Sequence, residues 1–282
     1  MRRRPMTIEP PFGSLAPSPA MERVRHLARG LGPTYFGRKA ASLLLGAAGG
    51  RAKRAYDVSV FESERARLQP YDNLCEKRVY LTPQLWEAPE RAFLEGVISR
   101  HDHQEFVFAD IGANVGLYTL FARAVCKRAG KRLIAVCVEA DPTMHARFEV
   151  NMIASGAGGD VRLFKCAASG ASGPVAFSVN TKNRGMSRID AAGNVETIAR
   201  PLIDIFKEAN VSRLDALKID IEGHEYATLR AFFSEAPAAL HPQFLLMEYG
   251  HERGFPTAEA LALQAGYAYR LRTKRNLVMA RS

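Results

Sequence analysis

Cysteine is scarce in this chain of 282 residues, and its four cysteines are widely spaced. There is no CxxC pair and no spacing typical of zinc ligands, so neither a disulfide framework nor a zinc site is indicated. Cys126, Cys137 and Cys166 lie in apolar runs and are predicted to be buried free thiols. Such cysteines indicate a reducing compartment, and we expect a cytoplasmic protein.

Long hydrophobic runs are also missing. The apolar stretch Ala40–Gly50 is short and interrupted by glycine, whereas spanning a bilayer takes about 20 residues. Three arginines begin the chain, but no apolar segment follows them, so a secretory signal is not indicated. Residues 1–20 are instead rich in proline and are expected to be disordered.

Several common catalytic motifs do not occur either. The chain has no GxSxG, no GxxxxGK[ST] and no HExxH, which argues against the hydrolase, P-loop and metalloprotease sites that these motifs build. The candidate chemistry therefore rests on carboxylates placed near the ends of predicted strands.

The positive charge of the chain is concentrated in an N-terminal arm, residues 1–55. The arm holds 11 of the 39 Lys and Arg residues and 2 of the 29 acidic residues, and the remainder is close to neutral. We favour a solvated, partly helical and partly disordered leader. The alternative is an arm that contacts an anionic membrane surface or nucleic acid. Nucleic acid is the weaker alternative because few aromatic side chains accompany the charge.

From residue 106 onward, apolar strand-like runs alternate with amphipathic helical runs. This pattern predicts an α/β fold with a parallel sheet, helices on both faces and an antiparallel C-terminal hairpin. We divide the chain into the arm, a helical lead-in and possible substrate cap (56–105) and a main domain (106–282). The predicted strands are Phe106–Ile111, Leu133–Val138, Val161–Ala167, Leu214–Ile219, Phe244–Met247 and Tyr267–Leu271, with an inserted pair Val175–Val179 and Val195–Ala199. The predicted helices are Met21–Leu31, Phe36–Leu45, Gln84–Ile98, Val115–Arg128, Thr143–Ser155, Leu202–Ala209, His224–Phe233 and Thr257–Ala265.

Asp110, Gly112, Asn114 and Gly116 follow the first strand of the main domain and mark a tight turn into a helix. Glycine has no Cβ, so the backbone of such a turn can approach a nucleotide-like ligand closely. The pattern is not the GxGxxG of pyrophosphate sites, and Asp110 would repel pyrophosphate. It suits a cationic ligand such as S-adenosylmethionine, which carries an ammonium and a sulfonium group. The alternative is a tight turn with no ligand.

Glu139 ends the next predicted strand and follows Asp110 at the distance of a βαβ unit. An acid in this place can accept hydrogen bonds from both ribose hydroxyls, although a nicotinamide cofactor would need the same acid. The nearby Asp141 is expected to cap the helix that Pro142 begins. Asp110 and Glu139 together indicate a nucleoside-containing ligand.

A third group of ionisable residues, Lys218, Asp220, Glu222, His224 and Glu225, closes the strand within Leu214–Ile219. Open parallel sheets bind ligands at this edge. A lysine–carboxylate pair beside a histidine suits proton abstraction from a hydroxyl. A helix N-terminus is the alternative explanation for the acids, but it does not account for Lys218 inside the strand.

The motifs DIGANVG, VEADP and LKIDIEGHE, in this order and spacing, resemble the FkbM family of S-adenosylmethionine-dependent methyltransferases over roughly Trp86–Glu248. The resemblance implies the class I, Rossmann-like fold of seven strands and O-methylation of a sugar, glycolipid or polyketide-like hydroxyl. It implies that Asp110, Gly112 and Gly116 face the amino-acid end of the cofactor and that Glu139 holds the ribose. It also implies that Asp220 and Glu222 line the cleft for methyl transfer. His224 stands where the family often has a small residue.

The predicted site therefore combines a cofactor set with a catalytic set. No metal site is predicted, although Asp220, Glu222 and Glu248 could be either plain carboxylates or ligands. Cofactor binding is assigned to Asp110, Gly112, Asn114, Gly116, Glu139, Ala140 and Ala167. Catalysis is assigned to Lys218, Asp220, Glu222 and His224.

The methyl acceptor is expected to be a hydroxyl of a small molecule or glycan. Its pocket would be built from the arm, residues 56–100 and the insertion Ser169–Val195. Two alternatives stay open: an RNA methyltransferase that grips phosphate with the arm, and a catalytically silent cofactor-binding module. The chain has no [DN]PP[YFW] stretch, which argues against amino methylation of a base. The polar residues of the insertion are Asn180, Lys182, Asn183, Arg184, Ser187 and Arg188.

Overall fold

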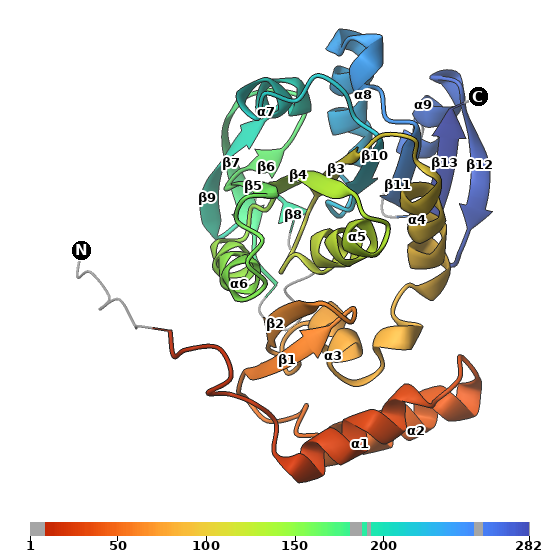
Figure 1. Ribbon diagram of the computed structural model, residues 1–282. Coiled ribbons are helices and arrows are strands. Elements are labelled where there is room, and N and C mark those ends of the chain that lie inside the picture. Colours follow the sequence, from red (N-terminus) through yellow and green to blue (C-terminus); the bar gives the residue numbers. More distant parts are fainter. Residues whose placement is uncertain (1–8, 181–187, 191–192, 251–255, 282) are drawn as a thin grey trace.

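A seven-stranded sheet forms the centre of the molecule (Figure 1). The computed structural model describes residues 9–180, 188–190, 193–250 and 256–281, and the order of this sheet is β12-β13-β11-β10-β3-β4-β5. Neighbouring strands are parallel except that β13 runs antiparallel to both β11 and β12. The predicted sheet and C-terminal hairpin are therefore confirmed. The strands are β3 Glu105–Ile111, β4 Arg132–Val138, β5 Val161–Phe164, β10 Ala216–Ile219, β11 Phe244–Glu248, β12 Tyr267–Arg272 and β13 Asn276–Arg281.

Helices cover both faces of this sheet. Phe106 and Phe108 of β3 belong to the apolar core on one face, and Val107 and Ala109 belong to the core on the other. Side chains alternate along a strand, so a strand buried on both faces is a continuous apolar run in the sequence. One face is covered by α4 Ala88–Arg100, α5 Leu117–Arg128 and α6 Pro142–Ala154. The other is covered by α7 Leu202–Glu208, α8 Glu225–Glu235 and α9 Ala258–Gln264, with a short 3-10 helix η3 at Ala238–Leu240.

The predicted strand Val161–Ala167 is divided in two. Its first part, β5, stays in the central sheet, whereas β6 (Ala167–Ala168) pairs with β9 instead of β4 and joins a second sheet of order β6-β9-β7-β8. The predicted inserted pair is confirmed as antiparallel β7 and β9. The remaining strands of this sheet are β7 Gly173–Ser178, β8 Arg188–Ile189 and β9 Val195–Arg200. The insertion residues Lys182, Asn183, Arg184 and Ser187, and the side chain of Arg188, lie outside the described part of the chain.

The N-terminal arm packs against the rest of the chain from residue 9 onward. The buried carboxylate of Asp57 accepts a hydrogen bond from the backbone N–H of Gly13 at 2.7 Å and pairs with Arg67 Nε at 2.7 Å. The predicted disorder is therefore wrong for residues 9–20, and residues 1–8 lie outside the described residues. The contact between Gly13 and Asp57 joins residues 44 positions apart, which a local sequence pattern does not reveal.

Two helices of the arm lie beneath a β-hairpin and α3 in Figure 1. They confirm the predicted helices Met21–Leu31 and Phe36–Leu45. None of the helices in the described residues is both long enough and apolar enough to cross a membrane. The elements are α1 Pro19–Arg29, α2 Tyr35–Ala47, β1 Tyr56–Val60, β2 Glu64–Leu68, α3 Leu74–Leu81 and the 3-10 helix η1 Pro83–Leu85.

The predicted helix Gln84–Ile98 begins later than expected. Glu87 has a positive φ of 41°, and α4 starts at Ala88. Pro89 fits this start because proline is well tolerated in the first turn of a helix. The break leaves Glu87 in the wall of the cavity described below.

Arg147 of α6 joins this helix to α3 and the turn before it through buried ion pairs. Its guanidinium lies 2.7 Å from Glu76 Oε2 and 2.7 Å from Asp72 Oδ2. We expect Arg147→Met to lower the free energy of unfolding by about 3–5 kcal/mol, because it leaves a buried carboxylate without its partner. Urea denaturation measures the change. As a control, Arg132→Met removes an exposed pair with Glu105 and should cost at most about 1 kcal/mol. Equal losses in the two variants would show that the buried pairs do not stabilise the fold.

Candidate active site

A cavity opens at the carboxyl ends of β3, β4 and β10, which is the edge where open parallel sheets bind ligands. Its empty volume is about 880 Å³, including the part open to solvent. Ten of the eleven predicted site residues line it, and Gly116 does not. The ten are Asp110, Gly112, Asn114, Glu139, Ala140, Ala167, Lys218, Asp220, Glu222 and His224.

The turn after β3 needs two glycines for different reasons. Gly112 has a φ of 77°, and a Cβ there would lie 1.9 Å from the carbonyl oxygen of Asp220. Gly116 has a φ of 82°, and its Cβ would lie 2.8 Å from the ring of Phe148. Gly112 thus allows the close approach of two turns in the cavity wall, and Gly116 allows α5 to pack on α6.

Lys218 is the cross-strand neighbour of Asp110 in the β3–β10 pair. Its ammonium lies 3.6 Å from Asp110 Oδ1 and 3.5 Å from Asp220 Oδ2. Burial alone would lower the pKa of Lys218, but the carboxylates of Asp220 and Asp110 outweigh burial and raise it above its usual value. A lysine that keeps its charge cannot take up a proton, so Lys218 serves as the electrostatic link between the two aspartates.

Glu139 closes the turn that follows β4. Its Oε2 accepts a hydrogen bond from Asn114 N and its Oε1 accepts one from Asp141 N, both at 2.7 Å. Burial raises the pKa of Glu139 to about 7, although both hydrogen bonds favour the charged form. Each oxygen has a second lone pair, so Glu139 can also accept hydroxyl groups from a ligand in the cavity. Asp141 caps α6 as predicted, accepting from Thr143 N at 2.8 Å.

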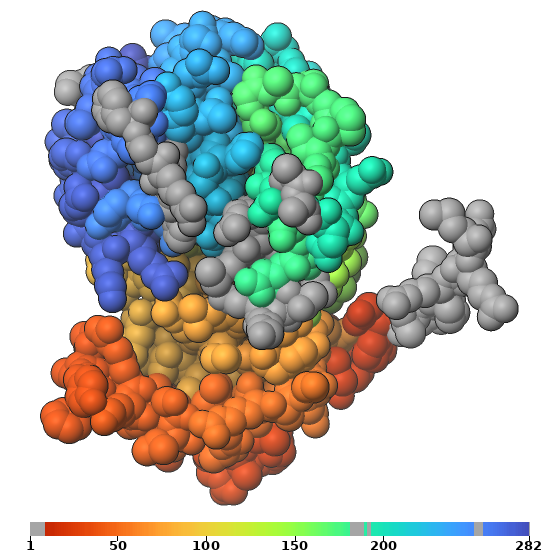
Figure 2. All heavy atoms as spheres, turned by 180° about the vertical axis from the view of Figure 1, so that it is seen from behind, coloured from red at the N-terminus to blue at the C-terminus, as the bar shows by residue number. Residues whose placement is uncertain are grey.

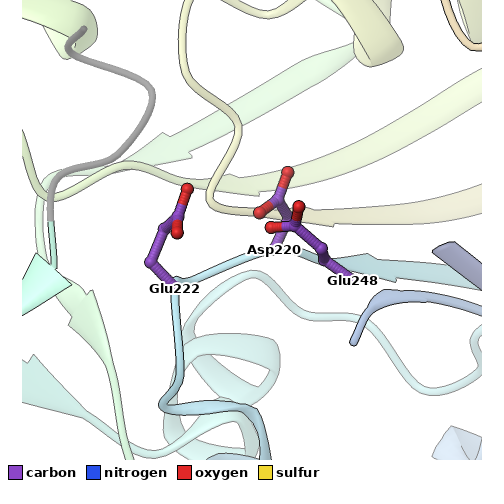
Figure 3. A group of neighbouring side chains, drawn as sticks. All are labelled: Asp220, Glu222 and Glu248. Atoms are coloured by element: carbon purple, nitrogen blue, oxygen red, sulfur yellow. The ribbon is translucent and has the colours of Figure 1, made fainter. Parts of the chain in front are cut away.

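Three carboxylates, those of Asp220, Glu222 and Glu248, gather beside the ends of β10 and β11 (Figure 3). An oxygen of each lies within 4.8 Å of the others. Burial and the neighbouring charge of Asp220 raise the pKa of Glu248 to about 9, so Glu248 is protonated at neutral pH and hydrogen-bonds Asp220. Carboxylate oxygens are also the ligands that hard divalent cations prefer. This group can therefore share either a proton or a cation.

His224 precedes α8 and lines the cavity. Burial lowers the pKa of His224, so its imidazole is neutral at pH 7 and can accept a proton. The adjacent Glu225 faces its own loop, and its carboxylate accepts from Ile221 N at 2.8 Å and from Gly223 N at 2.9 Å. Glu225 therefore holds the loop that carries Glu222 and His224.

The lead-in also contributes to the cavity wall, through residues that no sequence motif marks. This wall includes Cys75, Trp86 and Glu87, together with Tyr118 of α5. The Tyr118 hydroxyl donates to Glu87 Oε2 at 2.6 Å. The buried Trp86 indole N–H has no hydrogen-bond partner in the described part of the chain, which is rare for a buried donor and fits a ligand in the cavity. No spacing rule signals these residues, because only folding brings them to the strand ends.

Backbone strain also occurs in this wall. Three non-glycine residues that line the cavity have positive φ, namely Glu87 (41°), Asn114 (54°) and Glu222 (56°). Such a conformation costs about 1–2 kcal/mol for most residues, and strained positions cluster at functional sites. The strain at Glu87 and Glu222 agrees with a functional role for this cavity.

The strand order, the antiparallel hairpin and a cavity at the ends of β3 and β4 define the class I methyltransferase fold. The chain belongs to the FkbM methyltransferase family: the Methyltransferase FkbM domain matches residues 110–271. This match confirms the family inferred from the motifs and extends beyond Glu248 into β12. Membership implies S-adenosylmethionine as the methyl donor.

Three solved structures share distant similarity with the chain. The FkbM methyltransferase of Methylobacillus flagellatus KT is 15% identical, with 74% of this chain covered and a TM-score of 0.44, and the chain spans 55% of its length. TrmK of M. capricolum, in complex with S-adenosylhomocysteine, is 9% identical, with 67% and 66% of the two chains covered and a TM-score of 0.38. An S-adenosylmethionine-dependent methyltransferase of Agrobacterium tumefaciens is 11% identical, with 70% and 53% covered and a TM-score of 0.40. No curated protein matches the sequence.

Proposed function

We propose that the protein is an S-adenosylmethionine-dependent O-methyltransferase that acts on a hydroxyl of a sugar, glycolipid or polyketide-like metabolite. One observation carries the proposal: a single cavity joins the β3 turn and Glu139 to Asp220 and His224. The first two suit a nucleoside cation, and the last two suit removal of a proton from a hydroxyl. Family membership supports methyl transfer, and the proton-accepting groups favour an oxygen acceptor.

In this proposal, Gly112 and Asn114 hold the amino-acid end of the cofactor, and Glu139 accepts hydrogen bonds from its ribose. Ala140 and Ala167 line the cavity beyond Glu139, and their small side chains leave room for the base. When bound, the cofactor supplies a methyl group that its positive sulfur activates. The enzyme then has to position the acceptor in line and remove its proton.

Asp220 is the proposed proton acceptor, with Glu222 and His224 as its neighbours in the cavity. The bound cofactor would supply its methyl group to the acceptor oxygen. The hydroxyl proton passes to the Asp220 carboxylate. Lys218, which lies 3.5 Å from Asp220, keeps this carboxylate oriented and does not take the proton.

A radiolabelled methyl-transfer screen tests the proposal. The acceptors are glycans, glycolipids, small hydroxylated metabolites and RNA. Each is tested once with magnesium and once with a chelator, because three carboxylates lie close enough to share a cation. We expect label in a hydroxyl of a small molecule or glycan. Label in RNA would replace the proposal by the alternative in which the arm grips phosphate. Bound cofactor without transfer to any acceptor would indicate a catalytically silent module.

Two expectations about cellular placement stay predictions. Contact of the arm with an anionic membrane is supported by apolar side chains that α1 and α2 expose among basic residues. A cytoplasmic location is supported by the four free thiols, three of them buried. The exposed apolar side chains, each 65–79% accessible, are Leu27, Tyr35, Phe36 and Leu43.

Cofactor binding should strengthen with rising pH. Burial raises the pKa of Glu139 to about 7. Below this pH a bound proton occupies one hydrogen-bond acceptor site of the carboxyl group. Above this pH the proton has left, and the carboxylate can accept at that site again. We expect the Kd for S-adenosylhomocysteine, measured by calorimetry, to fall by up to about tenfold between about pH 6 and 8. Glu139→Gln should remove this part of the pH dependence while the titration of the ligand itself remains. An unchanged profile in the variant would rule out the ribose role of Glu139.

A further inference from the structure

A second, larger cleft lies between the N-terminal arm and the main domain. Its walls are α2, α3, the start of α4 and the turn between β12 and β13, and its empty volume is about 1440 Å³, including the part open to solvent. These elements meet at the lower right of Figure 1, and Figure 2 shows the orange arm approaching the blue C-terminal atoms at the lower left. Five cationic side chains line the cleft: Arg38, Lys77, Arg78, Lys274 and Arg275.

Most of this positive charge is not neutralised within the described residues. Four of the five cations have no carboxylate within 4.0 Å among those residues. The fifth, Arg275, has its Nη1 3.8 Å from Oε1 of Glu248, the acid whose pKa is raised to about 9. The cleft therefore carries a concentrated positive field that an anion can satisfy.

The two acids that also line the cleft are engaged elsewhere. Glu90 is buried and accepts hydrogen bonds from Thr273 Oγ1 at 2.6 Å and Asn276 Nδ2 at 2.9 Å, which fixes the β12–β13 turn against α4. Glu87 accepts from the Tyr118 hydroxyl at 2.6 Å. Neither acid pairs with a cation of the cleft.

The cations stand above an apolar floor. Arg38 shares one face of α2 with Ala41 and Leu45, at helical spacings of three and seven residues, and Lys77 stands one turn from Leu81 on α3. An apolar floor with a cationic rim is complementary to an anionic group attached to a less polar body.

The cleft and the active-site cavity adjoin. Glu87 lines both, and Arg275 reaches from the cleft to Glu248, which in turn hydrogen-bonds Asp220. The opposite end of the cavity, near Glu139, is assigned to the cofactor. A molecule seated in the cleft therefore lies next to the part of the cavity wall that Glu87 forms.

We propose that this cleft binds a phosphate group of the methyl acceptor while the acceptor hydroxyl enters the cavity past Glu87. The inference rests on the proposed function. Guanidinium groups bind phosphate oxygens in a bidentate manner, and lysine adds point charge. Cations on α2, on α3 and on the β12–β13 turn surround the cleft from separate sides, which suits a group with two or more negative charges. The acceptor is then a phosphorylated or diphosphate-linked hydroxyl compound, on either a lipid or a soluble carrier.

Inorganic pyrophosphate serves as the probe for this site. Calorimetric titration of the full-length protein at low salt should show saturable binding, and Lys77→Gln combined with Arg78→Gln should weaken it by about tenfold or more. The matched control, Lys53→Gln combined with Lys207→Gln, removes the same charge from exposed positions outside the cleft and should change binding by less than about twofold. Equal pyrophosphate affinity in the two double variants, or no binding to the wild-type protein, would overturn the proposal.

Two further measurements complete the test. Flotation with phosphatidylcholine vesicles that contain phosphatidic acid distinguishes a lipid carrier from a soluble one. Loss of vesicle binding in the Lys77→Gln, Arg78→Gln variant but not in the control variant assigns a lipid phosphate. Pyrophosphate binding without such a difference assigns a soluble acceptor. S-adenosylhomocysteine affinity, measured on the same samples, should be equal in all three proteins. Pyrophosphate binding in the cleft without any S-adenosylhomocysteine binding would defeat the proposed function and leave only an anion site.

Discussion

Asp220→Asn is expected to lower kcat by about 100-fold or more, because a placed proton acceptor is worth about 10²–10⁴-fold in rate. Asparagine has nearly the shape of aspartate but cannot take the proton of the acceptor hydroxyl. Asp220 lines the cavity with 37% of its side chain exposed, and it lies beside the charged Lys218. The measurement is steady-state kinetics with the acceptor that the screen identifies, alongside calorimetry with S-adenosylhomocysteine, whose affinity should stay close to that of the wild-type protein.

Two further variants make this result specific. Asp204→Asn changes an exposed aspartate of α7 and should leave kcat unchanged. His224→Asn distinguishes the two candidate proton acceptors. If His224 were the base, the large loss of kcat would occur in this variant and not in Asp220→Asn. Turnover at the native rate by Asp220→Asn would contradict the assigned role.

Gly112→Ala is expected to raise the Kd for S-adenosylhomocysteine by about 100-fold or more, equivalent to about 2.8 kcal/mol. The new Cβ would lie 1.9 Å from the carbonyl oxygen of Asp220, so the turn that faces the cofactor has to move. The matched control is Gly130→Ala. Gly130 also has a positive φ, 66°, but nothing lies within 4 Å of the position that a Cβ would take there. Calorimetry on both variants separates the effect of the close contact with Asp220 from the effect of backbone strain. Equal losses of affinity would contradict the assignment of the Gly112 turn to the cofactor site.

Prediction from the sequence succeeded where a local pattern determines the structure. The apolar run Phe106–Ile111 has to be buried on both faces, which predicts a parallel sheet flanked by helices. The carboxyl ends of parallel strands meet at one edge, so Glu139 and Asp220 were expected near the β3 turn, and they line the same cavity. Asp141 was expected to cap a helix because Pro142 follows it, and the structure confirms this.

Prediction failed where contacts join distant parts of the chain. The arm is ordered through Asp57 and Arg67, and Thr273 meets Glu90 across 183 positions. The basic cleft likewise collects residues from three regions of the chain, so no window of sequence displays it. The position of Glu87 in the wall depends on a positive φ, a conformation that residue type alone does not indicate.

Lys218 shows how a correct signal can have a different explanation. A lysine inside an apolar strand suggested a catalytic pair, and it does lie in the cavity. Its neighbour across the sheet is Asp110, which only the register of two strands reveals. The lysine pairs with the carboxylates of Asp110 and Asp220, and Asp220 is the proton acceptor that we propose.

Calorimetric titration of the full-length protein with S-adenosylhomocysteine tests the cofactor site most directly. Saturable binding at one site per chain is expected, retained in Gly130→Ala and weakened by about 100-fold or more in Gly112→Ala. A folded wild-type protein that releases no heat with this compound would contradict the assignment of the β3–β4–β10 cavity to the methyl donor.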